Sequence, residues 1–290
     1  MRRLDKALLA VSIFLMLSSV LATHFQVYAF WKAITFFGDE KFYMVLIPVI
    51  YLGYSSSYGI ALFIPFIFGM WINLFLKNFF KLPRPPESYR IVEARGYGFP
   101  SGHAQGSSMV FGYFAYTKKS IGVHFFCLAM IVLISLSRIV LGVHYWRDIF
   151  GGILLGTAVI FIGVYLKEKI KYTPKVALLG IILSLLLPVI SRSVGYANET
   201  FSIVEGSLIG AVVGYSAFKQ FNLPDTSEIP LKKRAIMTTI GLFVSGAGYV
   251  AWKSGAPGLP TFALSTFAMV FLVPWTFLRL FDRYKMNNNI

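Results

Sequence analysis

Long apolar stretches recur along the whole chain of 290 residues, and they constrain its fold more than any other feature of the sequence. Hydrophobic side chains make up 57% of the residues and charged ones only 13%, which would leave a water-soluble globule with too much exposed apolar surface. Most stretches approach the ~20 residues that a membrane-spanning helix needs. The sequence therefore predicts an all-α, polytopic helical membrane protein.

Ten membrane spans are predicted, of which the second and the fourth are short. They lie at 7–23, 41–56, 58–80, 104–117, 121–141, 148–166, 175–195, 200–218, 235–252 and 258–279. The segment 25–37 mixes aromatic residues with Lys32, which is more typical of a helix lying in the membrane interface than of a span.

The chain has a formal net charge of +15, and the distribution of that charge indicates what it is for. With the N-terminus in the cytoplasm and the spans alternating, most basic residues outside the motifs described below fall on the cytoplasmic side. The ordinary basic residues on the opposite side are Lys32, Lys41, Arg192 and Lys253. This pattern obeys the positive-inside rule. Because the basic residues are divided between two membrane faces, we expect no nucleic-acid partner.

A first polar cluster follows the span 58–80. Lys77 ends that span, and Arg84 stands between Pro83 and Pro85. Proline ends a helix and favours extended geometry in the residue before it, so we expect Arg84 on a stiff segment just beyond the bilayer. Its guanidinium group suits two phosphate oxygens at once, whereas Lys77 offers a point charge. Taken alone, this cluster has an alternative interpretation, as basic side chains that reach into the interface from a helix end.

The second cluster, Pro100-Ser101-Gly102-His103, directly precedes the span 104–117. A serine and a glycine at a helix start offer a hydroxyl group and free backbone N–H groups, and the helix dipole favours an anion there. The imidazole of His103 could then protonate a departing group. The alternative interpretation is a helix cap followed by an interfacial histidine.

The third cluster closes the span 121–141. Arg138 ends that span, Gly142 permits a turn, and His144 and Asp148 are spaced to share one face of a helix. A carboxylate bonded to one imidazole nitrogen leaves the other nitrogen as an acceptor and hence as a nucleophile. A histidine and an aspartate at a helix start can equally serve a structural purpose. All three clusters fall on the outer face of the topology derived from loop charges.

Together the clusters resemble the three-part signature of the type-2 phosphatidic acid phosphatase superfamily. The matching residues are Lys77-x6-Arg84-Pro85, Pro100-Ser101-Gly102-His103 and Ser137-Arg138-x5-His144-x3-Asp148. The resemblance covers about residues 40–170 and implies a six-helix core like that of membrane lipid phosphatases.

This resemblance also implies the role of each residue. His144 is the nucleophile, Asp148 orients it, and His103 is the acid for the leaving group. The implied phosphate-binding residues are Lys77, Arg84, Ser101, Gly102 and Arg138. Members of the family need no metal ion or other cofactor. That agrees with a sequence that has one cysteine, Cys127, and neither a zinc-ligand cluster nor an acidic pair to carry magnesium.

We expect two regions along the chain. Residues 1–171 would form the six-span phosphatase core with the three motifs, and residues 172–290 a C-terminal extension of four spans. In the extension Gly206, Gly210 and Gly214 recur at every fourth position, which favours close helix packing over an internal duplication. Glu205 is a functional candidate, because an acidic side chain within a span is costly, although an interfacial position would make it ordinary.

The favoured function is an integral-membrane phosphatase for a lipid phosphate or diphosphate, with its site on the outer face of a bacterial or archaeal cell membrane. An isoprenyl diphosphate such as undecaprenyl diphosphate is preferred as substrate, because the loop 86–99 would cover the site and add positive charge. The residues expected to do so are Tyr89, Arg90, Arg95, Tyr97 and Phe99.

Two alternatives remain at this point. A lipid phosphotransferase that uses a lipid diphosphate as donor would carry the same motifs. A transporter or binding protein for anionic lipids would need no turnover, and the presence of both His103 and His144 argues against it. The sequence does not indicate the oligomeric state.

Overall fold

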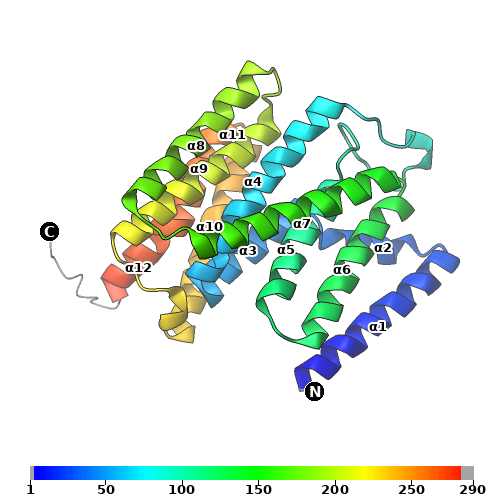
Figure 1. Ribbon diagram of the computed structural model, residues 1–290, viewed down its shortest axis with the longest axis horizontal. Helices are drawn as coiled ribbons and strands as arrows, with labels where there is room; N and C mark the ends of the chain where they lie inside the picture. Colours follow the sequence, from blue (N-terminus) through cyan, green and yellow to red (C-terminus); the bar gives the residue numbers. More distant parts are fainter. Residues whose placement is uncertain (1–2, 282–290) are drawn as a thin grey trace. The chain divides into compact units, whose positions relative to one another are not determined.

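Helices dominate the computed structural model, which describes residues 3–281, and no β-strand occurs in that range (Figure 1). The α-helices are α1 (Arg3–His24), α2 (Tyr28–Phe36), α3 (Glu40–Pro48), α4 (Ser56–Phe80), α5 (Gly102–Thr117), α6 (Ile121–Val140), α7 (Trp146–Lys169), α8 (Pro174–Ser193), α9 (Glu199–Gln220), α10 (Leu231–Lys253), α11 (Gly258–Phe267) and α12 (Val273–Phe281). Shorter helical turns are η1 (Val49–Tyr54), η2 (Glu87–Tyr89), η3 (Thr226–Glu228) and η4 (Ala268–Leu272).

Within the described residues, 8 helices are long and apolar enough to cross a membrane, counting Gly258–Leu280 as one. Exposed apolar side chains such as Phe14 and Leu17 on α1 are suited to lipid contact. The chain is thus a polytopic helical membrane protein, as the sequence predicts. The segment 25–37, which we predict to lie in the membrane interface, contains the short helix α2.

Two of the ten predicted spans are not among these 8 helices. The expected span 41–56 is divided between α3 and the π-helical turn η1, and the chain becomes extended at Ser55. The expected span 104–117 is α5, which has only 16 residues. Most residues of α5 are buried, including polar ones such as Gln105. Because α5 contacts other helices, it does not need the long apolar surface of a lipid-exposed span.

The chain divides into two compact units, and the polar motifs all belong to one of them. The site-bearing unit comprises residues 1–43 and 72–165, of which residues 3 onward are described, and the second unit comprises residues 44–71 and 166–290, described as far as 281. These units are defined by contacts within the fold. The predicted boundary at residue 171 separates the motif-bearing region from the C-terminal extension, and it stays a prediction.

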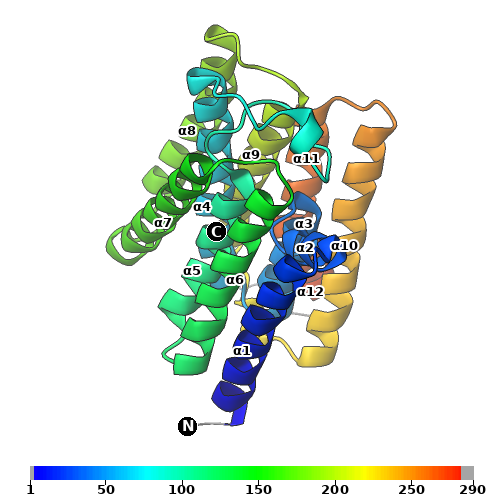
Figure 2. The ribbon, with the colours of Figure 1, turned by 90° about the vertical axis from the view of Figure 1, so that its right-hand side faces the viewer.

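In the site-bearing unit, α6 is the central helix, and α1, α2 and α5 all pack against it (Figure 2). The buried core between these helices includes Trp31, Phe111, Leu133 and Ile134. Glycines bring α7 close to the start of α5. A Cβ atom at Gly152 would lie 2.5 Å from the carbonyl oxygen of Ser101, so this packing fixes α5, which carries the second motif.

In the second unit, α8 packs along α9, and α9 packs along α11 (Figure 1). The glycine series explains the second contact. A Cβ atom at Gly206 would lie 2.3 Å from the carbonyl oxygen of Leu259, and one at Gly210 would lie 2.4 Å from that of Ala263. The expected close helix packing is thereby confirmed.

Glu205 is buried in this second unit. One carboxylate oxygen accepts hydrogen bonds from the indole N–H of Trp71 at 3.2 Å and from the hydroxyl group of Ser191 at 2.6 Å. The other oxygen lies 3.7 Å from a guanidinium nitrogen of Arg192. These contacts offset the cost of burying an acidic side chain.

Candidate active site

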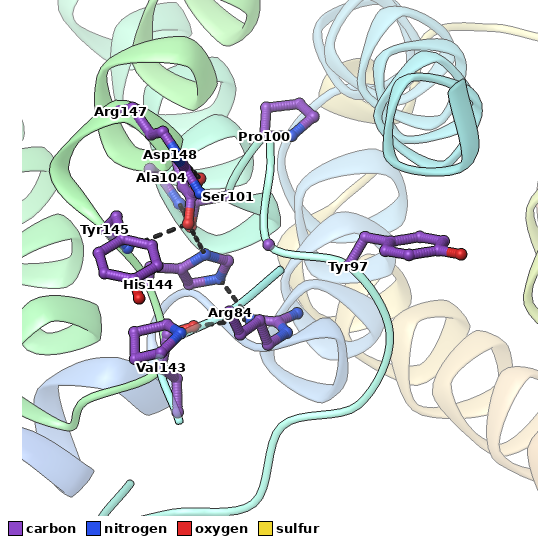
Figure 3. A network of polar contacts seen from close by, with 12 residues as sticks. Arg84, Tyr97, Pro100, Ser101, Ala104, Val143, His144, Tyr145, Arg147 and Asp148 are labelled. Atoms are coloured by element: carbon purple, nitrogen blue, oxygen red, sulfur yellow. Dashed lines mark hydrogen bonds and ion pairs between the residues drawn. The ribbon is translucent and has the colours of Figure 1, made fainter. Parts of the chain in front are cut away.

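A helix start brings His144 and Asp148 together. α7 begins at Trp146, so His144 precedes the helix and does not share a helical face with Asp148, contrary to our expectation. The carboxylate instead reaches back. Its Oδ2 atom accepts a hydrogen bond from the backbone N–H of Tyr145 at 3.0 Å and lies 3.2 Å from Nδ1 of His144 (Figure 3). Asp148 therefore caps the helix and orients the imidazole with the same oxygen atom.

The end of α6 fixes the path of the chain into His144. The N–H of Val143 donates to the carbonyl oxygen of Arg138 at 3.1 Å, and the N–H of Gly142 donates to that of Ile139 at 2.9 Å. These are the two bonds of a Schellman motif, which needs a left-handed residue after the helix. Gly142 supplies it with φ of +71°, and a Cβ atom there would also meet the carbonyl oxygen of Tyr89.

Arg84 contacts the other imidazole nitrogen of His144. Its Nη1 atom lies 2.9 Å from Nε2 of His144 and donates to the carbonyl oxygen of Val143, also at 2.9 Å (Figure 3). A guanidinium group can only donate hydrogen bonds, so Nε2 must accept, and the proton of the neutral ring must reside on Nδ1 facing Asp148. This tautomer directs the lone pair of Nε2 toward a cation.

Burial keeps His144 neutral. It lowers the pKa of His144 from 6.5 to about 3, against the opposing effect of the hydrogen bond to Asp148, and nearby cations lower it further. Burial also lowers the pKa of Arg84, although the Asp148 carboxylate opposes this. An unprotonated imidazole beside a half-buried cation is the state that nucleophilic attack on an anionic ester requires.

Backbone carbonyl groups of the loop 86–99 hold the two cations of the first motif. Lys77 donates to the carbonyl oxygens of Tyr97 and Gly98, each at 3.1 Å. The Nε atom of Arg84 donates to that of Gly96 at 3.1 Å. Neutral oxygens therefore position these side chains, and both cations interact electrostatically with the Asp148 carboxylate.

We expected the side chains of this loop to cover the site and add positive charge, and Arg90 does interact electrostatically with Arg84. Arg90 donates to the carbonyl oxygens of Pro85 at 2.8 Å and Ala94 at 3.1 Å, so it stabilises the loop itself. The ring of Tyr97 points away from His144 (Figure 3). Arg95 is exposed.

The second motif starts α5 as predicted. Ser101 is the N-cap, its hydroxyl oxygen accepts from the N–H of Ala104 at 3.5 Å, and its own N–H donates to the carbonyl oxygen of Asp148 at 2.9 Å. The first-turn N–H groups of Gly102 and His103 have no intrahelical acceptor. This helix start can therefore hold an oxyanion with a hydroxyl proton and two amides.

Across the described residues, neither ring nitrogen of His103 has a hydrogen-bond partner. Burial lowers the pKa of His103 well below 6.5, and Arg138, His144, Arg84 and Lys77 lower it further. An anionic group bound among these cations would raise the pKa of His103 again and allow it to donate a proton.

Arg138 is buried, and its Nη1 atom donates to the hydroxyl oxygen of Thr35 at 2.7 Å. Its Nε atom is buried without a hydrogen-bond partner in the described residues. All the predicted site residues thus lie in one unit, and the contacts above join the first motif to the third and the third to the second.

Several residues that support the site were not predicted from the sequence. Asn73 of α4 donates to Oε1 of Gln105 at 2.7 Å and to the carbonyl oxygen of Pro100 at 3.2 Å, which ties the first motif to the second. Asn73 and Gln105 are polar residues within apolar helical segments, and this feature of the sequence could have identified them. Thr35 and Gly98 carry no such signal. A Cβ atom at Gly98 would lie 2.9 Å from Oδ2 of Asp148, so glycine there lets the loop approach the carboxylate.

Parts of this chain are similar to known proteins. The sequence model of the PAP2 superfamily matches residues 57–172, which include all three motifs. Phosphatidylglycerophosphatase B of Bacillus subtilis is 30% identical over 151 residues, which cover 48% of this chain and 74% of that protein. A dihydrosphingosine 1-phosphate phosphatase of Schizosaccharomyces pombe is 29% identical over 137 residues, 41% of this chain and 33% of that protein.

Among solved structures, the crystal structure of a transmembrane PAP2-type phosphatidylglycerolphosphate phosphatase from Bacillus subtilis is similar to this chain. It shares 22% sequence identity, covers 58% of this chain and 97% of its own, and superposes with a TM-score of 0.43.

Proposed function

The chain belongs to the PAP2 superfamily, and from this premise we propose that it is an integral-membrane phosphatase that hydrolyses a lipid phosphate or diphosphate. One observation carries the proposal. Nδ1 of His144 faces the Asp148 carboxylate, and Nε2 lies 2.9 Å from the guanidinium group of Arg84. The nucleophilic nitrogen is therefore directed to the place where a phosphoryl group would meet its cations.

In the first step, Nε2 of His144 attacks phosphorus, and the bond from phosphorus to the leaving oxygen breaks. His103 gives its proton to that oxygen. The Nδ1 proton stays on the ring, and the Asp148 carboxylate stabilises the positive charge of the phosphohistidine. In the second step, water attacks phosphorus and gives a proton to His103, the phosphorus–nitrogen bond breaks, and inorganic phosphate leaves.

The remaining motif residues bind the phosphoryl group. Arg84 would exchange its contact with Nε2 of His144 for phosphate oxygens, and Lys77 and Arg138 would share the charge that spreads over the equatorial oxygens. Ser101 and the first-turn amides, including that of Gly102, would hold a further oxygen. Three cations supply the charge stabilisation that a metal ion gives in other phosphatases, so we propose that the reaction needs none.

We propose an isoprenyl diphosphate as the preferred substrate. The support is the positive charge of Lys77, Arg84 and Arg138. The three motifs contain one carboxylate, that of Asp148, and it also contacts His144. Lipid monophosphates are the competing class, because the names of both relatives specify them.

Phosphate release by the purified protein in EDTA tests the function. The panel contains an isoprenyl diphosphate, phosphatidylglycerophosphate, phosphatidate, dihydrosphingosine 1-phosphate and glucose 6-phosphate, with His144→Ala as the control for contaminating phosphatases. We expect the isoprenyl diphosphate to have the highest kcat/KM and glucose 6-phosphate the lowest. Activity that appears only with added magnesium would disprove metal independence, and release that requires a lipid acceptor would favour the phosphotransferase.

We also propose that the site faces the extracytoplasmic side, with the N-terminus in the cytoplasm, because the loop charges obey the positive-inside rule. Cysteines replacing the exposed residues Ser88 and Lys232 report the two sides in a Cys127→Ala background. An impermeant thiol reagent applied outside intact cells should label the first and spare the second. Labelling of both from outside would contradict this orientation.

A further inference from the structure

We propose that the segment 35–39, where α2 ends and α3 begins, is part of the phosphate site and that Thr35 is a positioning residue for Arg138. The inference rests on the proposed function, because it concerns the same site. This segment precedes all three motifs and lies outside the match to the PAP2 superfamily, which begins at residue 57. No sequence motif therefore predicts a role for it.

Thr35 fixes one side of the Arg138 guanidinium group. Its hydroxyl oxygen accepts from Nη1 at 2.7 Å, so the rotation of the guanidinium plane is set by a neutral partner. Nε, on the opposite side of the group, is buried and has no hydrogen-bond partner among residues 3–281. A buried unsatisfied donor is costly unless a ligand meets it. The side of Arg138 that Thr35 leaves available is the one suited to a phosphate oxygen.

Gly38 lies against the proposed acid. A Cβ atom at this position would lie 3.0 Å from Cδ2 of His103 and 2.6 Å from Cγ2 of Ile134. Glycine is thus the residue that lets the turn pack directly against the His103 ring. The same turn therefore contacts both a phosphate-binding cation and the group that protonates the leaving oxygen.

Asp39 brings a negative charge to this wall of the site. Its carboxylate interacts electrostatically with Arg138, and its Oδ1 atom accepts from the N–H of Lys41 at 2.9 Å. A fixed negative charge near Arg138 weakens the attraction of the site for an anion. Thr35 and Asp39 are therefore predicted to act on anion affinity in opposite directions.

Inhibition by inorganic vanadate measures this affinity, because vanadate adopts the five-coordinate geometry of phosphoryl transfer. With the full chain in detergent, Thr35→Val should raise the vanadate inhibition constant and lower kcat/KM by roughly tenfold each, the lower range for a hydrogen bond to a charged group. Thr35→Ser should restore most of this loss because it keeps the hydroxyl group. Asp39→Asn, which keeps the hydrogen-bond acceptor for Lys41, should strengthen vanadate binding about threefold, a change of under 1 kcal/mol.

Two controls separate positioning from general damage. Thr23→Val removes a hydroxyl group that bonds only to the carbonyl oxygen of Ser19 in its own helix, at 2.8 Å, and should leave vanadate inhibition unchanged. In an Arg138→Lys background, Thr35→Val should have little further effect, because the two residues act as one unit.

The outcomes are distinct. A wild-type protein that neither binds vanadate nor releases phosphate overturns the proposed function. A wild-type protein that does both, with Thr35→Val folded and unchanged, overturns only the role of Thr35. If Thr35→Val does not fold, Asp39→Asn decides the role of the segment, and unchanged or weaker vanadate binding by that variant overturns it.

Discussion

Three cations of the site-bearing unit and two carboxylates of the second unit have different kinds of partner. In the site-bearing unit, Lys77 and Arg84 donate to backbone carbonyl oxygens and Arg138 donates to a hydroxyl oxygen, all of which are neutral. In the second unit, Glu205 has a cation and two neutral donors beside it, and Asp225 is surrounded by donors.

Asp225 illustrates the second pattern. Its Oδ2 atom accepts from the hydroxyl groups of Ser55 and Ser56 and from the N–H of Ser57 at 2.8 Å, and its Oδ1 atom accepts from Ser227. Partial burial raises the pKa of Asp225, but these hydrogen bonds together lower it below its ordinary value. Here the protein satisfies the charge internally and fixes a turn.

The difference separates a binding site from a structural contact. Neutral acceptors position a cation and leave its charge for an incoming anion, whereas a counter-ion or a full set of donors removes the need for one. A buried charge within an apolar sequence is therefore informative only together with its partners.

The largest effect is expected from His144→Ala. This variant should lose turnover by about 10^4-fold or more, because it lacks the proposed nucleophile, while the protein stays folded. Glu205→Gln, in the other unit, is its matched comparison. Phosphate release in a quenched assay measures both. Retention of more than a few per cent of wild-type activity in His144→Ala would show that another group is the nucleophile.

Asp148→Asn should reduce kcat by roughly 10^2- to 10^4-fold, the range for an imidazole that loses its orienting carboxylate. Vanadate should still inhibit the residual activity, because the three cations remain. A loss of vanadate inhibition as large as the loss of kcat would indicate that Asp148 supports the site as a whole and not the nucleophile.

Arg84→Lys should lower kcat/KM by roughly 10- to 100-fold, because a point charge cannot make the several directed hydrogen bonds of a guanidinium group. Steady-state kinetics on the best lipid substrate measures this loss, with Arg90→Lys as the comparison, since Arg90 is bound within the loop. Equal effects of the two changes would contradict the distinction between them.

The value of kcat/KM should rise by up to about tenfold for each unit by which the pH falls. Burial and the surrounding cations lower the pKa of His103, so the fraction of His103 that can donate a proton rises as the pH falls. The pKa of His144 is lowered to about 3, so the nucleophile stays neutral over the same range. Activity should therefore rise from about pH 8 toward about pH 5.

His103→Gln is the control for this profile. In the variant, the part of the rise that belongs to His103 should disappear, and the part caused by ionisation of the substrate should remain. The loss of activity should also be smaller with p-nitrophenyl phosphate, whose leaving group needs no proton. An identical profile in both proteins would remove His103 from the role of acid.

The smallest effect is expected from Glu205→Gln. The amide oxygen can still accept from Ser191 and Trp71, so the variant should keep turnover within about twofold and lose about 1 kcal/mol of stability as the contact with Arg192 weakens. Thermal unfolding in detergent and phosphate release measure the two quantities. A severe loss of turnover without a change in stability would place Glu205 in the chemistry and abolish the comparison between the units.

The sequence by itself determined the membrane class and predicted the residues of the site. Apolar runs of about 20 residues leave few alternatives to spanning helices, because backbone groups in a bilayer must pair within the helix. The motifs could be found because each lies beside a proline, a glycine or a helix start, whose effects on the backbone are local. For the same reason the helix start at the second motif was predicted correctly, and Ser101 is the N-cap there.

Only the tertiary structure decided how the site residues are held. The tautomer of His144 depends on Arg84, which is distant in sequence, and Lys77 and Arg84 are positioned by carbonyl groups, whose pairing no side-chain pattern records. The helix α5 is stable at its short length because neighbouring segments bury it. Thr35 contacts Arg138 because α2 packs against α6. Contacts between distant segments depend on packing, and a single sequence contains no local signal for them.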